Sequence, residues 1–286
     1  MAHKFGLIGF HLSHSISGVI HEAGLKDLGV DATYEILETD PEDLVTRLKT
    51  LRSTGYLGFN VTIPLKVPTS LFMDKVDKYA DIAGCVNTVK IMQDRTFSGY
   101  NTDIYGFEHA IPKEFQEKLI GESASIIGTG GASRAAAVGL IELGVSELAF
   151  FSRNIINAAP MVNYLRKKFP ETDIKMFQIQ SIGNLDKSAI VVNTTPVGMR
   201  GHSMDKCPLS YATMERLRED AVVYDVIYNP TKTLFLDTAE KMGHKTINGL
   251  DMLIHQAARA EELWLGKKPN TDKMKISALE SLQNFE

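Results

Sequence analysis

Short apolar runs alternate with longer amphipathic stretches along most of the chain. The runs are rich in branched and aromatic residues, which favour strands, and the stretches between them have the length of helices. In the first third of the chain the pattern predicts strands and helices in turn, at Lys4–Phe10, Ser17–Leu28, Thr33–Leu37, Pro41–Ser53 and Leu57–Thr62. Such alternation is typical of βαβ units, so we expect a mainly parallel sheet.

The rhythm changes between residues 81 and 101. Val86–Val89 and Thr96–Tyr100 have the composition of strands, and a turn at Gln93-Asp94 lies between them. This predicts an antiparallel hairpin on the edge of the first sheet. A polar connector follows, and we expect it to be helical over Phe107–Leu119.

A second series of strands begins after this connector. Its members are expected at Ala124–Gly128, Glu147–Phe151, Ile174–Phe177, Ala189–Asn193 and Ala221–Asp225. Two helices near Leu250–Leu265 and Asp272–Asn284 end the chain, and the pattern leaves open which sheet they cover. The sequence therefore predicts an α/β protein with two sheets.

Composition narrows the class of protein. A length of 286 residues suggests about two domains, and 44% hydrophobic with 23% charged residues is typical of a globular protein. The net charge of −4, without a cluster of Lys or Arg, does not favour nucleic acid as a partner. No apolar run reaches the roughly 18 residues of a membrane span, and the apolar stretch near Met1 is too short for a secretory signal. Cys85 and Cys207 are the only cysteines, too few for a disulfide framework and without the spacing of a metal site. Together these observations make a cytoplasmic, two-domain enzyme without structural metal the expectation.

A glycine-rich turn opens the second series of strands. Gly128, Gly130, Gly131 and Ala132 lie between a strand and an alanine-rich helix. The free N–H groups and the positive dipole end of such a helix suit a pyrophosphate, so these four residues are candidates for cofactor binding. The alternative is a tight turn without a ligand.

The end of the next strand bears on which nicotinamide cofactor is bound. An acidic residue there would accept hydrogen bonds from the ribose 2′-OH, but the chain has Ser152, Arg153 and Asn154 and no carboxylate from Phe150 through Lys168. Because a guanidinium recognises phosphate well, NADP is favoured over NAD, unless Arg153 is only a solvated surface charge. Thr194 follows a later apolar strand, and we expect it to line the cofactor cleft.

Polar residues also follow the strands of the first series. Ser15 and Ser17 precede a helix, where two hydroxyls can bind a carboxylate or simply cap the helix. Lys66 follows a strand that ends in Asn60-Val-Thr62, and the segments 84–88 and 99–103 end other strands. Ligands of open α/β sheets bind beyond the carboxyl ends of the strands, so these groups can converge.

The ordered motifs resemble the shikimate dehydrogenases, including the shikimate/quinate branch, over nearly the whole chain. They are His14-Ser-Ile-Ser17, Asn60-Val-Thr-Ile-Pro-Leu-Lys66, Val86-Asn-Thr88, Asn101-Thr-Asp103, Gly128-Thr-Gly-Gly-Ala132, Asp225-Val-Ile-Tyr-Asn-Pro230 and Asn248-Gly-Leu250 with Gln256. The chain departs from the family pattern at Gly18, where Pro is usual, and at Asp251, where Gly is usual.

This resemblance implies a role for each motif. Ser15 and Ser17 would hold a substrate carboxylate, and Lys66 and Asp103 would form the catalytic pair. The residues expected to bond the ring hydroxyls are Thr62, Asn87, Thr102 and Gln256, with Tyr228 nearby. Gly249 joins the cofactor-binding set. Residues 1–105 and 247–286 would form a discontinuous substrate domain and 106–246 a Rossmann-type domain, with the cofactor in the cleft between them.

The chemistry fits these residues. Oxidation of a secondary alcohol sends a hydride to the cofactor, so the protein must handle a proton and orient the ring. We treat Lys66 and Asp103 as one proton-sharing unit and assign the base to neither. The expected function is NADP-dependent, reversible reduction of 3-dehydroshikimate to shikimate in aromatic amino-acid (chorismate) biosynthesis, by a monomer or homodimer. A quinate/shikimate dehydrogenase using NAD and a non-catalytic nucleotide sensor are the alternatives, and retention of the Lys66/Asp103 pair argues against the sensor.

Overall fold

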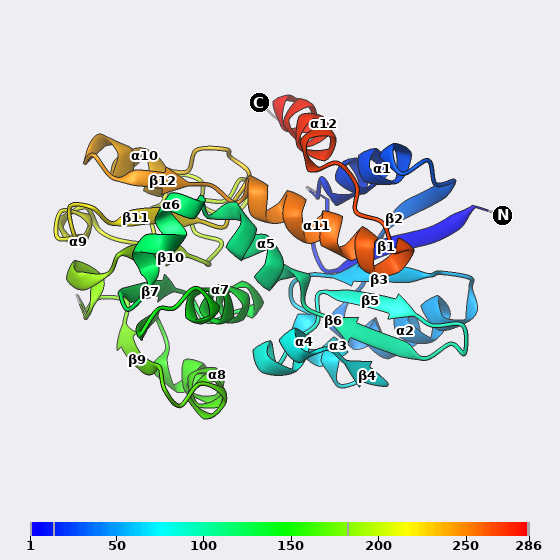
Figure 1. The fold of residues 1–286 in the computed structure, drawn as a ribbon, viewed down its shortest axis with the longest axis horizontal. Coiled ribbons are helices and arrows are strands. Elements are labelled where there is room, and N and C mark those ends of the chain that lie inside the picture. Colours follow the sequence, from blue (N-terminus) through cyan, green and yellow to red (C-terminus); the bar gives the residue numbers. More distant parts are fainter. Residues whose placement is uncertain (1, 14, 182, 285–286) are drawn as a thin grey trace. The chain divides into compact units, whose positions relative to one another are not determined.

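A computed structural model of the chain describes residues 2–13, 15–181 and 183–284. The chain forms two compact units, unit 1 (Met1–Gly106 and Ile254–Glu286) and unit 2 (Phe107–Leu253). Each contains one six-stranded sheet with helices packed on it (Figure 1), which confirms the predicted α/β class. No helix in the described ranges is long and apolar enough to cross a membrane.

The sheet of unit 1 has the order β2-β1-β3-β5-β6-β4. Its strands are β1 (His3–Gly9), β2 (Ala32–Glu38), β3 (Gly58–Val61), β4 (Lys75–Val76), β5 (Thr88–Ile91) and β6 (Phe97–Tyr100). β1 pairs in parallel with both β2 and β3, and β5 runs antiparallel to β3 and to β6. The parallel β1–β2–β3 group brings the carboxyl ends of three strands to one edge of the sheet.

The predicted hairpin is present as β5 and β6, but its expected position at the sheet edge is wrong. The two-residue strand β4 pairs in parallel with β6 and forms that edge instead. Two residues carry no hydrophobic periodicity, so the apolar pattern contained no signal for β4.

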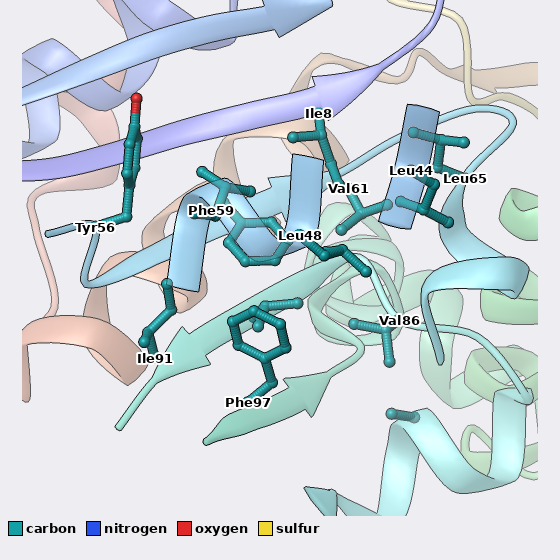
Figure 2. Packing of buried hydrophobic residues seen from close by; sticks show 13 residues of the cluster. Ile8, Leu44, Leu48, Tyr56, Phe59, Val61, Leu65, Val86, Ile91 and Phe97 are labelled. Atoms are coloured by element: carbon teal, nitrogen blue, oxygen red, sulfur yellow. The ribbon is translucent and has the colours of Figure 1, made fainter. Parts of the chain in front are cut away.

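Helices cover both faces of this sheet. The helices with residues in unit 1 are α1 (Ser17–Asp27), η1 (Pro41–Asp43), α2 (Leu44–Ser53), α3 (Lys66–Ser70), α4 (Lys78–Ala83), α5 (Thr102–Ala110), α11 (Leu250–Leu265) and α12 (Thr271–Gln283); α5 and α11 also contribute residues to unit 2. On one face, Leu44 and Leu48 of α2 pack with Phe59 and Phe97, whose rings meet edge to face at 5.8 Å (Figure 2). On the other face, Trp264 of α11 joins a cluster with residues of β1, β2 and α1, and α12 packs beside α1.

The sheet of unit 2 is parallel throughout, in the order β12-β11-β10-β7-β8-β9. Its strands are β7 (Ser123–Ile127), β8 (Glu147–Ser152), β9 (Asp173–Gln178), β10 (Ile190–Asn193), β11 (Val222–Asp225) and β12 (Lys245–Ile247). Counted within the unit, this is the doubly wound order in which strands 1 and 4 are neighbours at the switch point. β12, which the sequence pattern did not predict, completes the sixth position.

The helices of unit 2 lie on both faces of its sheet, as a parallel sheet requires. They are α6 (Lys113–Gln116), η2 (Glu117–Leu119), α7 (Gly131–Glu142), α8 (Ile155–Lys168), η3 (Leu185–Lys187), α9 (Tyr211–Met214) and α10 (Leu234–Lys241). The predicted helix Phe107–Leu119 is wrong as a single element. α5 starts five residues earlier, at Thr102, and Pro112 precedes the short helix α6.

Candidate active site

A buried ammonium–carboxylate pair lies at the carboxyl edge of the sheet in unit 1. Lys66 Nζ is 2.6 Å from Asp103 Oδ2, and the two side chains are only 14% and 7% exposed. Leu65 is fully buried in the core and fixes the start of α3, so Lys66 is presented at its first position. Asp103 lies in the first turn of α5 rather than on the loop that the sequence suggested, and a helix N-terminus favours a carboxylate.

Asn87 connects this pair to other polar groups. Its Nδ2 donates to Asp103 Oδ1 at 2.8 Å and to Thr102 Oγ1 at 2.9 Å, and it lies 3.3 Å from Gln256 Oε1. Its Oδ1 accepts the backbone N–H of Thr102 at 2.7 Å. The predicted residues Thr102 and Asp103 of α5 and Gln256 of α11 therefore surround the amide of Asn87. Asp103 connects this group to Lys66. Because Asn87 occupies Oδ1 of Asp103, Oδ2 is left for the ammonium.

A second set of polar residues, to which the sequence analysis gave no role, forms hydrogen bonds that fix Asn87. Asn60 Nδ2 donates to the Asn87 carbonyl at 3.3 Å and to Thr88 Oγ1 at 3.0 Å, and Thr88 Oγ1 donates in turn to Asn87 Oδ1. Tyr34 OH donates to Asn60 Oδ1 at 2.8 Å and so fixes which way the Asn60 amide faces. A polar residue inside the buried strand β3 was the available signal for Asn60, whereas Tyr34 is a common strand residue and gave none.

The residues beneath Tyr34 hold its ring in place. His21 stacks on that ring with centroids 4.2 Å apart, and its Nδ1 is 2.9 Å from Glu261 Oε1. Burial raises the pKa of Tyr34 well above its usual value and also raises the pKa of Glu261. The Tyr34 hydroxyl is therefore a permanent donor to Asn60 at physiological pH.

The predicted carboxylate site is formed by half-buried groups. Ser17 is the first residue of α1, and its backbone N–H donates to Ser15 Oγ at 3.3 Å. The N-cap residue is Ile16, which makes no side-chain cap, so neither serine is the N-cap of this helix. Thr62 follows β3 and is half-buried. His14 of the same motif lies outside the described residues.

The glycine-rich turn of unit 2 lies between β7 and α7, as predicted. Gly128 has φ of +110°, and a Cβ at this position would come within 2.6 Å of Thr194 Oγ1, so the position requires glycine. Gly130 is the N-cap of the 12-residue helix α7 and makes no side-chain cap. Gly131 and Ala132 begin the helix. Nothing lies within 4 Å of a Cβ built at Gly130, so a ligand can approach the first turn closely.

The residue predicted to bind the 2′-phosphate of NADP directly follows β8. Arg153 is exposed between β8 and α8, and within the described ranges no carboxylate pairs with its guanidinium. Ser152 Oγ accepts the Asn154 N–H at 3.2 Å, and Asn154 Oδ1 accepts the N–H of Asn157 as the N-cap of α8. These two side chains therefore shape the turn that presents Arg153.

The remaining predicted site residues, two for the cofactor and one for the substrate, follow three other strands of unit 2. Thr194 comes directly after β10, and its Oγ1 donates to the Ile127 carbonyl at 2.7 Å. Tyr228 is half-buried on the loop after β11, and Gly249 lies after β12. Tyr228 thus belongs to unit 2, whereas the other candidate substrate residues belong to unit 1.

Neither cysteine is part of a ligand cluster. Neither cysteine is in a disulfide, and Cys85 Sγ lies 3.3 Å from Asn101 Nδ2. Burial raises the pKa of Cys207, whose Sγ lies 3.6 Å from Met214 Sδ. In the part of the chain that the structure describes, no three His, Cys, Asp or Glu side chains are grouped as metal ligands.

Comparison with known proteins identifies the family. Residues 7–89 match the model of the shikimate dehydrogenase substrate binding domain, and residues 249–275 match that of the shikimate 5′-dehydrogenase C-terminal domain. The shikimate dehydrogenase (NADP(+)) of Methanocaldococcus jannaschii is 38% identical over 281 residues, which cover 97% of this chain and 96% of the relative. The chain belongs to the shikimate dehydrogenase family.

Solved structures of family members have the same fold over almost their whole length. Shikimate 5-dehydrogenase from Thermus thermophilus, in complex with NADP(H) and shikimate, superposes with a TM-score of 0.85 at 31% identity, covering 98% of this chain and 100% of that one. Quinate dehydrogenase from Corynebacterium glutamicum, in complex with NAD, gives a TM-score of 0.88 at 29% identity, covering 98% and 99%. The predicted family is confirmed, and it includes members that differ in substrate and cofactor.

Proposed function

We propose that the protein catalyses the NADP-dependent, reversible reduction of 3-dehydroshikimate to shikimate, the step that the resemblance implies in aromatic amino-acid biosynthesis. The observation that carries this proposal is the Lys66–Asp103 contact, held by Asn87 in the unit that contains the match to a substrate binding domain. The name of the M. jannaschii relative and the ligands of the T. thermophilus structure support the same substrate and cofactor.

Unit 1 would bind the cyclohexene acid. Ser15 and Ser17 offer hydroxyls at the positive end of α1 to a carboxylate, which that end of a helix stabilises. The candidates for the ring hydroxyls in unit 1 are Thr62, Asn87, Thr102 and Gln256. The predicted participation of Tyr228 stays a prediction. We assign residues 1–105 and 247–286 to the substrate domain and residues 106–246 to the cofactor domain.

Lys66 and Asp103 would handle the proton of the reacting alcohol. An ammonium has three donors, and Asp103 Oδ2 takes one of them, so others remain for the alcohol or ketone oxygen. In the reductive direction the Lys66 ammonium–Asp103 pair gives one proton to the ketone oxygen while the carbon receives the hydride. In oxidation the pair, then short of that proton, takes it back from the alcohol O–H as the C–H hydrogen leaves as hydride. The bound nicotinamide supplies or accepts the hydride.

The residues of unit 2 fit NADP. The parallel strand order, the uncapped start of α7 and the open space at Gly130 are features of a dinucleotide site. Gly128, Gly131 and Ala132 complete the turn, and the exposed guanidinium of Arg153 suits a 2′-phosphate. The cofactor residues proposed with them are Ser152, Asn154, Thr194 and Gly249.

Quinate oxidation with NAD is the second candidate function. The C. glutamicum quinate dehydrogenase with bound NAD favours it, because its structure resembles this chain as closely as that of the shikimate enzyme. The Lys66–Asp103 pair serves either acid, since both carry a secondary alcohol, so the choice depends on ring contacts and on Arg153.

Initial rates of nicotinamide reduction with shikimate and with quinate, each with NADP⁺ and NAD⁺, test both functions. We expect the highest kcat/KM with shikimate and NADP⁺, and a preference for quinate and NAD⁺ would select the second candidate. No turnover with either acid would overturn both. A cytoplasmic location and a monomer or homodimer stay predictions.

The Arg153→Asp variant tests the cofactor assignment. A carboxylate at this position repels a 2′-phosphate and accepts a ribose 2′-OH, so the ratio of kcat/KM for NADP⁺ to that for NAD⁺ should fall at least about tenfold. Arg216→Asp, at an exposed position before β11, is the matched control and should leave the ratio unchanged. An unchanged ratio in Arg153→Asp would remove the phosphate role.

A further inference from the structure

Three loops of unit 2 leave the carboxyl ends of neighbouring strands. They carry Thr194 after β10, Tyr228 after β11 and Gly249 after β12. A doubly wound sheet binds one mononucleotide on each side of its switch point. Because Arg153 follows β8 on the side formed by β7–β9, the loops of β10–β12 lie on the side that takes the nicotinamide half.

A buried carboxylate lies at the centre of these loops. Asp225, the last residue of β11, is 0% exposed. Its Oδ1 accepts hydrogen bonds from the Ile227 N–H at 3.1 Å and from Asn193 Nδ2 at 3.0 Å, and its Oδ2 accepts one from Thr233 Oγ1 at 2.7 Å. All three partners are neutral donors. The bonds to Ile227 and Thr233 hold both ends of the loop that presents Tyr228.

Asn193 transmits the same constraint to the loop after β10. Its Oδ1 accepts hydrogen bonds from the Thr195 N–H at 3.0 Å and from Thr195 Oγ1 at 2.7 Å. Its Nδ2 also lies 3.3 Å from the Val197 carbonyl. One end of the Asn193 side chain therefore shapes the turn that carries Thr194, while the other end is held by Asp225.

The loop after β12 rests on the one that Asp225 controls. The Gly249 N–H donates to the Ile227 carbonyl at 3.0 Å, and a Cβ on Gly249 would collide with the Val226 carbonyl. Asn248 Nδ2 donates to the Thr231 carbonyl at 3.1 Å. Gly249 can pack this closely only if the backbone of residues 226–231 keeps its conformation. The conformations of all three loops therefore depend on the hydrogen bonds of Asp225.

We propose that Asp225 is a positioning residue, which with Asn193 and Thr233 holds the loops after β10, β11 and β12 in the arrangement that receives the nicotinamide half of NADP. This inference rests on the proposed function. Asp225 acts only through its neighbours, since its side chain is enclosed by its own unit.

Calorimetric titration with two ligands separates positioning from a general structural role. NADP⁺ contacts both halves of the site, whereas 2′,5′-ADP reports only the half near Arg153. Asp225→Ala removes all three hydrogen bonds, so the Kd for NADP⁺ should rise about tenfold or more, while that for 2′,5′-ADP stays within about twofold. Asp173→Ala is the matched control, because Asp173 pairs with Lys175 at the exposed amino end of β9, the opposite edge of the sheet from these loops.

Melting of the ligand-free variants checks that they fold. If Asp225→Ala does not fold, Asn193→Ala and Thr233→Val each remove one of the hydrogen bonds to Asp225, together with the other bonds of the substituted side chain. Each should weaken NADP⁺ binding several-fold with the same selectivity. An unchanged Kd for NADP⁺, or an equal loss for both ligands, would overturn the positioning role. Failure of the wild-type chain to bind NADP⁺ would instead overturn the proposed function, and this inference with it.

Discussion

Each unit contains an asparagine that donates its Nδ2 to the Oδ1 of a buried aspartate, and the two pairs differ in what else the aspartate meets. In unit 1, Asn87 holds Asp103, whose second oxygen contacts the Lys66 ammonium at 2.6 Å. In unit 2, Asn193 holds Asp225, whose second oxygen accepts from the Thr233 hydroxyl. Among the described residues, the first carboxylate therefore has a cationic partner and the second has none.

In the roles proposed above, this difference separates a pair that transfers a proton from one that holds loops in place. A carboxylate beside an ammonium is a proton-sharing pair, and 14% of the Lys66 side chain stays exposed. A buried carboxylate without a cation is costly to ionise, and burial raises the pKa of Asp225 to about 7. Its three hydrogen bonds lower that pKa only in part. In these proposed roles, the same Asn–Asp arrangement serves proton transfer in one unit and loop geometry in the other.

Removing the cation of the first pair should have the largest effect. Lys66→Ala leaves Asp103 and Asn87 in place but removes the group that shares the proton, so kcat should fall about 10²–10⁴-fold, with a much smaller rise in KM. Steady-state rates with shikimate and NADP⁺ measure it. Lys49→Ala, at an exposed position of α2, should leave kcat unchanged. A near-normal kcat in Lys66→Ala would exclude this residue from the mechanism.

The buried carboxyl of the second pair, Asp225, should make the unfolding free energy depend on pH. Between about pH 4 and pH 7 the folded chain keeps the Asp225 proton while the unfolded chain has lost it, so unfolding takes place with fewer bound protons. This group therefore lowers the unfolding free energy as pH rises through that window, by up to about 1.4 kcal/mol per pH unit. Asp225→Asn removes this slope.

Urea unfolding of wild type and Asp225→Asn across this pH range measures the difference. The unfolding free energy of the variant should rise relative to that of the wild type as pH increases, even though the variant loses a hydrogen-bond acceptor. Asp237→Asn is the control: its lysine partner lowers the pKa of Asp237, so its contribution changes below the window. If the curves of wild type and Asp225→Asn stay parallel, Asp225 is ionised in the same range in both states.

The smallest effect is expected from the layer beneath Asn87. Tyr34→Phe removes only the hydroxyl that orients Asn60, so kcat should fall about fivefold, which corresponds to one hydrogen bond. Tyr56→Phe removes a similar hydroxyl, bonded to Glu35 at 2.5 Å, and should leave kcat unchanged (Figure 2 shows Tyr56). Equal kinetics in the two variants would show that the orientation of Asn60 does not matter for Asn87.

Much of this molecule could be predicted from local pattern. Buried strands such as β8 and β10 consist of apolar, β-branched and aromatic residues, and the glycine turn before α7 has a backbone requirement visible in the residues themselves. β4 and β12 were missed because strands of two and three residues carry too little periodicity. The helical start at Thr102 was missed because its donors are used by contacts with Asn87, which lies in a different segment.

The sequence determined the composition of each strand end: which hydroxyls, amides and charges stand there, because side-chain chemistry and alternating hydrophobicity are local properties. The meeting of Asp103 with a lysine was implied by the family resemblance and not by local pattern. Only the tertiary structure decided that Asp225 meets neutral donors and that Tyr34 faces Asn60 rather than solvent. These outcomes depend on strand order and on which helix covers which face. They arise from burial shared among distant segments, where a polar group must find whatever partner the packing places within hydrogen-bond distance.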